Sequence, residues 1–130
     1  IANGMTQIYS SVGLPRFYSH AHFIEFPTED IYSEGESSHG LATLAIYHVA
    51  RTFENPEIQD FFMKAFDDVM RPVCKPKNIM WESAIYEGAR EYWRINGLIP
   101  PSQGSETEKQ WAEANRTVGE DEMLQAQPRP

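Results

Sequence analysis

The residues of this sequence that could do chemistry begin with two histidines, His20 and His22, near its start. Histidines two residues apart project from one face of an extended strand, and the carboxylates of Glu25 or Glu29 are near enough to complete a set of metal ligands. Two histidines among the aromatic residues of an extended arm are more often ordinary polar side chains. The sequence therefore favours no metal in this chain and keeps a site at the two histidines as the alternative.

No other part of the sequence carries a complete catalytic signature. A Gly-rich phosphate loop, a Cys-x-x-Cys pair, a His-Glu-x-x-His zinc motif and a nucleophile elbow are all absent. The one cysteine, Cys74, has no histidine near it in the sequence that could act as its base, so a structural role is favoured. Trp93 is expected at an interface, because it lies off the apolar stripe of its predicted helix.

The elements that position these residues are predicted to be helices that follow an extended arm. Residues 1–36 lack helical periodicity and contain several Gly and Pro residues, which predicts an extended arm. Asn55 followed by Pro56 is a strong helix start, because Asn caps the free N–H groups and Pro fits the first turn. The predicted helices span about 38–53, 56–71, a third stretch from a cap at Asn78 to a stop at Gly97, and 106–116. The sequence thus predicts an all-α fold, with a small bundle of three to four helices over residues 37–117 and a polar tail over 118–130.

Composition and charge limit the classes of function. The chain has 130 residues, with 19 acids against 11 bases and a formal net charge of −8, and this acidity disfavours binding to nucleic-acid phosphates. No stretch approaches the roughly 20 apolar residues that span a bilayer, so no membrane role is expected. A single cysteine cannot form an internal disulfide, which fits a reducing compartment, and the cytoplasm is the expected location.

The order of breaks along the predicted helical domain resembles the helical amino-terminal domain of nitrile hydratase β subunits. That domain also occurs in thiocyanate hydrolase β subunits and in the small accessory (activator) proteins of nitrile hydratases. Its second helix ends in Met-x-Pro and its third in Gly-aliphatic-aliphatic. The matching runs here are Met70-Arg71-Pro72, Gly97-Leu98-Ile99 and the Gln110-Trp111-Ala112-Glu113-Ala114 run that precedes Thr117. The resemblance covers about residues 37–117.

The resemblance implies a β-type subunit of a nitrile-hydratase-like metallo-hydratase, a lyase in which this chain is not catalytic alone. It would pack on an α-type subunit that holds cobalt or iron in a cysteine-rich loop, with no cofactor in this chain, and a third, β-barrel subunit would complete the enzyme. Lys64 stands where the family places an arginine and is the candidate catalytic residue, while Tyr86 and Trp93 would bind substrate. Two alternatives stay open: an accessory protein that loads metal into the α subunit, and a structural helical module of an unrelated assembly.

Overall fold

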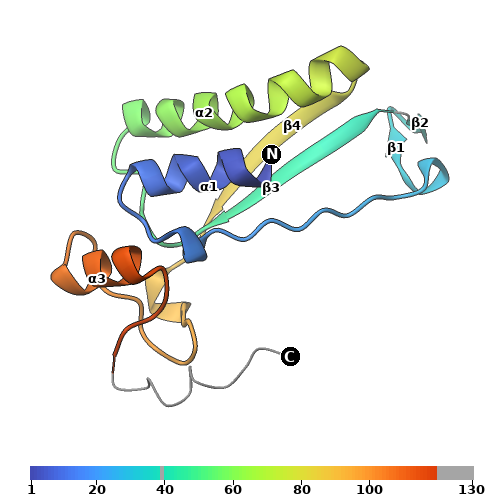
Figure 1. Cartoon of the computed structure of the whole chain (residues 1–130). Helices are drawn as coiled ribbons and strands as arrows, with labels where there is room; N and C mark the ends of the chain where they lie inside the picture. Colours follow the sequence, from blue (N-terminus) through green and yellow to red (C-terminus); the bar gives the residue numbers. More distant parts are fainter. Residues whose placement is uncertain (39, 120–130) are drawn as a thin grey trace.

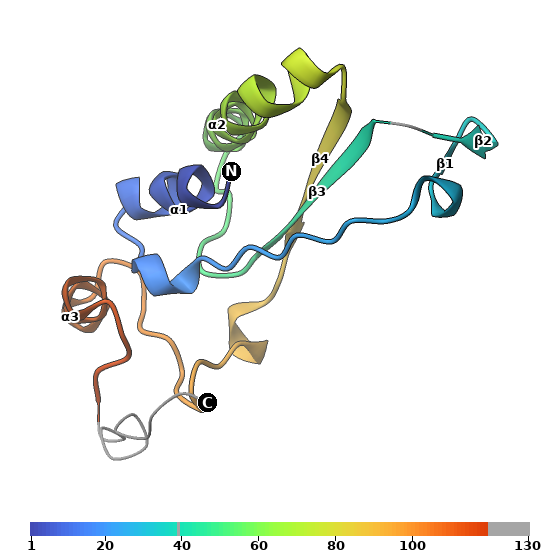
Figure 2. The same ribbon diagram turned by 45° about the vertical axis from the view of Figure 1, so that its right-hand side comes forward.

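The computed structural model describes residues 1–38 and 40–119 of the chain. Two helices, α1 (Ala2–Ser11) and α2 (Pro56–Cys74), lie on the same face of a two-stranded sheet made of β3 (Leu41–His48) and β4 (Met80–Glu87) (Figure 1). The described residues also form a hairpin of β1 (Tyr32–Ser33) and β2 (Glu36–Ser37), the helix α3 (Glu106–Ala114), and the 3-10 turns η1 (Arg16–Tyr18), η2 (Thr28–Asp30), η3 (Lys75–Lys77) and η4 (Arg90–Tyr92). The hairpin and α3 lie at opposite ends of the sheet (Figure 2).

The strands β3 and β4 are parallel and are joined through α2, which makes a β-α-β unit. Their register runs from the pair Leu41 and Met80 to the pair His48 and Glu87, so the two carboxyl ends lie side by side. These ends point toward the part of the chain that contains α3 (Figure 1). The unit therefore brings the loops that follow both strands to one edge of the sheet.

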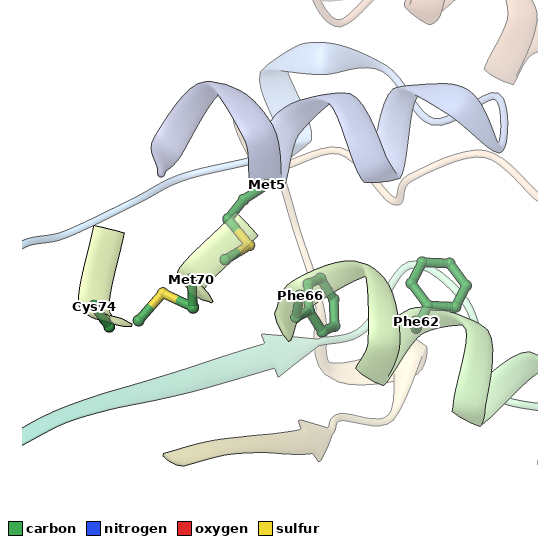
Figure 3. Close-up of a cluster of buried hydrophobic side chains, with 5 residues drawn as sticks. All are labelled: Met5, Phe62, Phe66, Met70 and Cys74. Atoms are coloured by element: carbon green, nitrogen blue, oxygen red, sulfur yellow. The ribbon is translucent and has the colours of Figure 1, made fainter. Parts of the chain in front are cut away.

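Helix α2 supplies most of the core. Its first turn is capped by the side chain of Asn55, whose Oδ1 accepts a hydrogen bond from the backbone N–H of Ile58 at 3.0 Å. Gly4 lets α1 approach closely, because a Cβ at this position would lie 2.9 Å from Cγ2 of Val69 on α2. The buried cluster between the two helices and the sheet consists of Met5, Phe62, Phe66, Met70 and Cys74 (Figure 3).

The prediction of an all-α fold is wrong, because the fold is mixed α/β. Residues 41–48 form β3 and residues 80–87 form β4, where helices were expected. The spacing of Leu41, Leu44 and His48 fits a helix, but the same stretch also alternates between inward and exposed side chains, and so short an apolar run satisfies both patterns. Pairing between two strands about 39 residues apart in the sequence stabilises the sheet over a helix. The local spacing of apolar residues carries no information about that pairing.

Two predicted helices are confirmed. Helix α2 begins at Pro56 as expected but continues past Pro72 to Cys74, and α3 occupies residues 106–114 of the stretch predicted as 106–116. Helix α1 lies where no helix was expected. Its inward side chains Met5, Ile8 and Tyr9 recur at helical spacing, but a helix of 10 residues gives so short a pattern that the prediction of an extended arm missed it.

Part of the predicted polar tail, residues 120–130, lies outside the described residues. None of the helices that the structure describes is long and apolar enough to cross a membrane.

Candidate functional site

Polar side chains gather at the carboxyl ends of β3 and β4. His48 and Glu87 end the two strands, and the backbone N–H of Gly88 donates to the carbonyl oxygen of His48 at 2.8 Å. A hollow of about 160 Å³ opens there, lined by Tyr47, His48, Val49, Tyr86, Glu87 and Gly88. Ligands of α/β folds bind outside the carboxyl ends of parallel strands, where loops converge. A wider groove of about 580 Å³ lies at the amino-terminal ends of the strands. Tyr9, Tyr18 and His48, whose pKa values are clearly shifted, lie near the carboxyl ends instead, and shifted pKa values are typical of functional sites.

His48 is the buried histidine of this site. It is 3% exposed, its Nδ1 lies 3.1 Å from the hydroxyl of Tyr9, and its ring stacks on Phe53 with centroids 4.5 Å apart. Burial lowers the pKa of His48 below its usual value, and the charge of Arg51 lowers it further, against the opposing effects of Glu87 and of the Arg51 backbone. Burial also raises the pKa of Tyr9 to about 12. Both groups are therefore uncharged at neutral pH.

Arg51 and Glu108 form a buried ion pair between the loop after β3 and the helix α3. Nη1 and Nη2 of Arg51 each donate to one carboxylate oxygen of Glu108 at 2.8 Å, so the contact is bidentate. The two side chains are only 12% and 5% exposed, and Oε1 of Glu108 also accepts from the backbone N–H of Gly104 at 3.0 Å. Oγ of Ser105 caps the helix by accepting from the backbone N–H of Glu108 at 3.2 Å. The ion pair thus fastens α3 to the carboxyl end of β3.

Tyr18, the last residue of η1, places a hydroxyl near this ion pair. The hydroxyl is buried, and it has no hydrogen-bond partner among the residues that the structure describes. Burial and the negative charge of Glu108 raise the pKa of Tyr18 to about 12, against the opposing charges of Arg51 and Arg90. Tyr18 therefore keeps its proton at neutral pH and is a hydrogen-bond donor.

Aromatic rings surround the Tyr18 side chain. The ring of Trp93 meets it edge to face with centroids 4.9 Å apart, and Trp111 lies 6.3 Å from the same ring. The guanidinium of Arg90 donates to the carbonyl oxygen of Pro100, which ties η4 to the loop before α3. Charged and phenolic groups therefore lie between apolar walls, where electrostatic interactions are stronger than in water.

The residues predicted for substrate binding and catalysis occupy different places. Lys64 lies on the exposed surface of α2, where its Nζ pairs with the carboxylate of Asp68 at 2.5 Å. Tyr86 lines the hollow and stacks on Tyr47 with ring centroids 5.5 Å apart, and Trp93 belongs to the aromatic wall. The fold thus brings Tyr86 and Trp93 to the loops after the strands, and the roles of all three residues remain predictions.

His20 and His22, the alternative metal ligands, are exposed in the extended run that follows η1. Within residues 1–38 and 40–119, no group of three or more His, Cys, Asp or Glu side chains is arranged to hold a metal ion. In this part of the chain the two histidines therefore lack a third ligand.

Sequence reasoning missed His48, Arg51 and Glu108 as a group. His48 fits the apolar stripe of a predicted helix, and Glu108 fits a capping box with Ser105, so each had a local explanation. One signal was available: Arg51 is the first Lys or Arg after Arg16, at the end of a long stretch without basic residues. A lone cation in such a place needs an acidic partner, and sequence alone does not say which.

The chain belongs to a family described as putative oxalocrotonate tautomerase enzymes, whose model matches residues 1–116. The solved structure of native RhCC from Rhodococcus jostii RHA1 is 33% identical, with a TM-score of 0.88 over 91% of this chain and 85% of that chain. A probable enzyme from the thermophilic fungus Aspergillus fumigatus is 43% identical, with a TM-score of 0.85 over 91% of this chain and 82% of that one. A solved structure of a mutant of RhCC is 32% identical, with a TM-score of 0.88 and shares of 95% and 82%. No curated protein matches the chain.

This family membership corrects the resemblance to nitrile hydratase. The predictions of a hydratase β subunit, of an accessory protein and of an unrelated helical module are all wrong, because the matching family and the similar structures are of another kind. The prediction of an α-type partner subunit with a third, β-barrel subunit is wrong for the same reason. The runs Met70-Arg71-Pro72 and Gly97-Leu98-Ile99 lie at the end of α2 and after η4. A helix end and a loop also fall at these places in this β-α-β fold, so the matching spacing does not indicate the hydratase domain.

Proposed function

We propose that this chain is a tautomerase-type enzyme that moves a proton within a small 2-oxo acid. The match of the family described as putative oxalocrotonate tautomerases over residues 1–116 carries this proposal. Oxalocrotonate is an unsaturated 2-oxo dicarboxylate, so the substrate class is a small carboxylate that interconverts between keto and enol forms. This reaction needs a proton acceptor, a proton donor and positive charge near the developing enolate.

The region around the carboxyl ends of β3 and β4 offers a group for each need. His48 lines the hollow and is uncharged at neutral pH, so its imidazole can accept a proton. Tyr18, with its pKa raised to about 12, can donate a hydrogen bond to the enolate oxygen. Arg90, whose guanidinium contacts a backbone carbonyl, supplies positive charge, and a planar guanidinium suits a carboxylate group, whereas the charge of Arg51 is balanced by Glu108.

Two further residues complete the proposed substrate site. Tyr86 in the hollow and Trp93 in the aromatic wall would contact the unsaturated carbon chain. The Tyr18 hydroxyl and Nε2 of His48 are covered by neighbouring atoms, so we expect the surrounding side chains to move when substrate binds. The single cysteine, Cys74, is buried and free, which supports the cytoplasm as the proposed location.

The test is to add the dienol form of oxalocrotonate to the full chain and to follow the loss of its ultraviolet absorbance. We expect ketonisation faster than in buffer, and a loss of about 100-fold in kcat for His48→Gln and for Tyr18→Phe, the usual effect of a general acid or base. The control Tyr32→Phe, on a side chain that is 65% exposed, should keep the wild-type rate. A wild-type rate equal to that of buffer would overturn the proposal.

A further inference from the structure

Two tyrosines form a stacked pair across the sheet. Tyr47 on β3 and Tyr86 on β4 are partners in the strand register, one residue before the carboxyl end of each strand. Their ring centroids lie 5.5 Å apart, with an angle of 25° between the ring planes. Residues that are directly opposite in a sheet project from the same face, so the contact between the rings follows from the pairing of β3 with β4.

The pair lies on the sheet face opposite to α1 and α2. Leu44 and Ile46 of β3 and Ile85 of β4 pack against the buried cluster between the helices and the sheet. Side chains alternate along a strand, so Tyr47 and Tyr86 point to the other face, where they are 83% and 55% exposed. Exposed side chains change rotamer within nanoseconds, so the two rings can reorient against each other without a change in the backbone.

The other tyrosines have no second phenol ring beside them among the residues that the structure describes. Tyr9 and Tyr18 contact rings of other residue types. Tyr32 and Tyr92 are 65% and 91% exposed and make no ring contact in the described part of the chain. A tyrosyl radical carries unpaired spin at the carbons ortho to its oxygen, and two such radicals couple only where these carbons meet. The stacked pair is therefore the place in the described fold where two tyrosines of one chain can couple.

We propose that Tyr47 and Tyr86 are an oxidative modification site, at which hydrogen peroxide and a haem peroxidase join the two rings as dityrosine. Each phenol loses one electron and one proton, and the two radicals form one carbon–carbon bond between their ortho carbons. The hydrogens on these two carbons then move to the phenol oxygens, which restores both aromatic rings. One hydrogen peroxide accepts the two electrons and the two protons and becomes two water molecules.

The crosslink would join the two strands at the hollow. Both tyrosines line it, and they lie about 39 residues apart in the sequence. A covalent link across such a distance restricts the unfolded chain, as a disulfide does, and it holds the carboxyl ends of β3 and β4 together. Oxidation would thus stabilise the β-α-β unit and change one wall of the hollow. The proposal rests on the ring contact and is independent of the proposed tautomerase activity.

The first test treats the full chain with a haem peroxidase and a limiting amount of hydrogen peroxide, followed by mass spectrometry under denaturing conditions. We expect a single chain that is lighter by two hydrogen atoms and shows dityrosine fluorescence. Its tryptic peptide 78–90, in which Tyr86 is the one tyrosine, should be linked to the peptide that contains Tyr47. Tyr47→Phe and Tyr86→Phe keep a stacked ring but remove the phenol, and each should abolish the link.

The matched controls are Tyr32→Phe and Tyr92→Phe, which remove exposed tyrosines outside the pair and should leave the link unchanged. Equal circular dichroism spectra of all variants before oxidation show that folding is retained. Free N-acetyltyrosine in the same mixture shows that the oxidant is active. No link within the wild-type chain while N-acetyltyrosine is coupled, or a link that survives Tyr47→Phe, would overturn the proposal.

The second test measures whether ring contact directs the coupling. In the double variant Tyr86→Phe/Glu82→Tyr the phenol stays on the same face of β4 but moves about 13 Å along the strand, away from Tyr47. We expect no link within this chain. Adding Thr43→Tyr should restore a link, because Thr43 and Glu82 are partners in the register. A link in the double variant, or none after Thr43→Tyr is added, would contradict the proposed dependence on register.

Discussion

The buried pair of Arg51 and Glu108 predicts a large loss of stability for Glu108→Ala. The substitution leaves the guanidinium of Arg51, which is 12% exposed, without its carboxylate and removes three hydrogen bonds that Glu108 accepts. Removing one member of a buried pair costs about 3–5 kcal/mol, because the remaining charge stays desolvated. For a chain of this size that corresponds to a fall in Tm of roughly 10–20 °C.

The assay is urea unfolding followed by circular dichroism at a fixed protein concentration. The double variant Arg51→Met/Glu108→Leu should recover much of the loss, because an apolar pair leaves no buried charge. The control Lys64→Ala breaks the exposed pair with Asp68, whose side chains are 75% and 56% exposed, and should cost no more than about 0.5 kcal/mol. A cost below about 1 kcal/mol for Glu108→Ala would refute the reasoning, since that is the range of surface pairs.

Two further predictions concern Gly4 and His48. Gly4→Ala should destabilise the fold by about 1 kcal/mol or more despite the better helix propensity of Ala, because the new Cβ would lie 2.9 Å from Cγ2 of Val69. Thermal unfolding checks this, and the same substitution in a Val69→Ala background should cost less. Burial lowers the pKa of His48, so at this residue the folded state binds fewer protons than the unfolded state; the contribution of His48 to stability is fully present above a pH of about 6.5 and is lost as the pH drops below it. Free energies of unfolding measured between about pH 8 and pH 5 should fall less steeply for His48→Gln than for the wild type, and equal slopes would contradict the assignment.

The helices α2 and α3 could be predicted from the sequence, because their signals are local. Asn55 and Pro56 start α2, and Ser105 starts α3 through a contact with a residue three positions along the chain. The strands could not be predicted in the same way. The run from Leu41 to His48 is too short to separate a helical from a strand period. Its partner strand comes only after α2 in the sequence, so no local pattern connects the two strands.

By itself the sequence determined the starts of α2 and α3, the acidic charge and the lack of a self-contained catalytic motif. Only the tertiary structure decided the site, since Arg51 and Glu108 are 57 residues apart and Tyr9 and His48 are 39 apart. The physical reason is the range of the interactions. A helix cap acts within one turn, whereas a parallel sheet and a buried ion pair gain free energy only after folding has brought distant groups together and removed them from water.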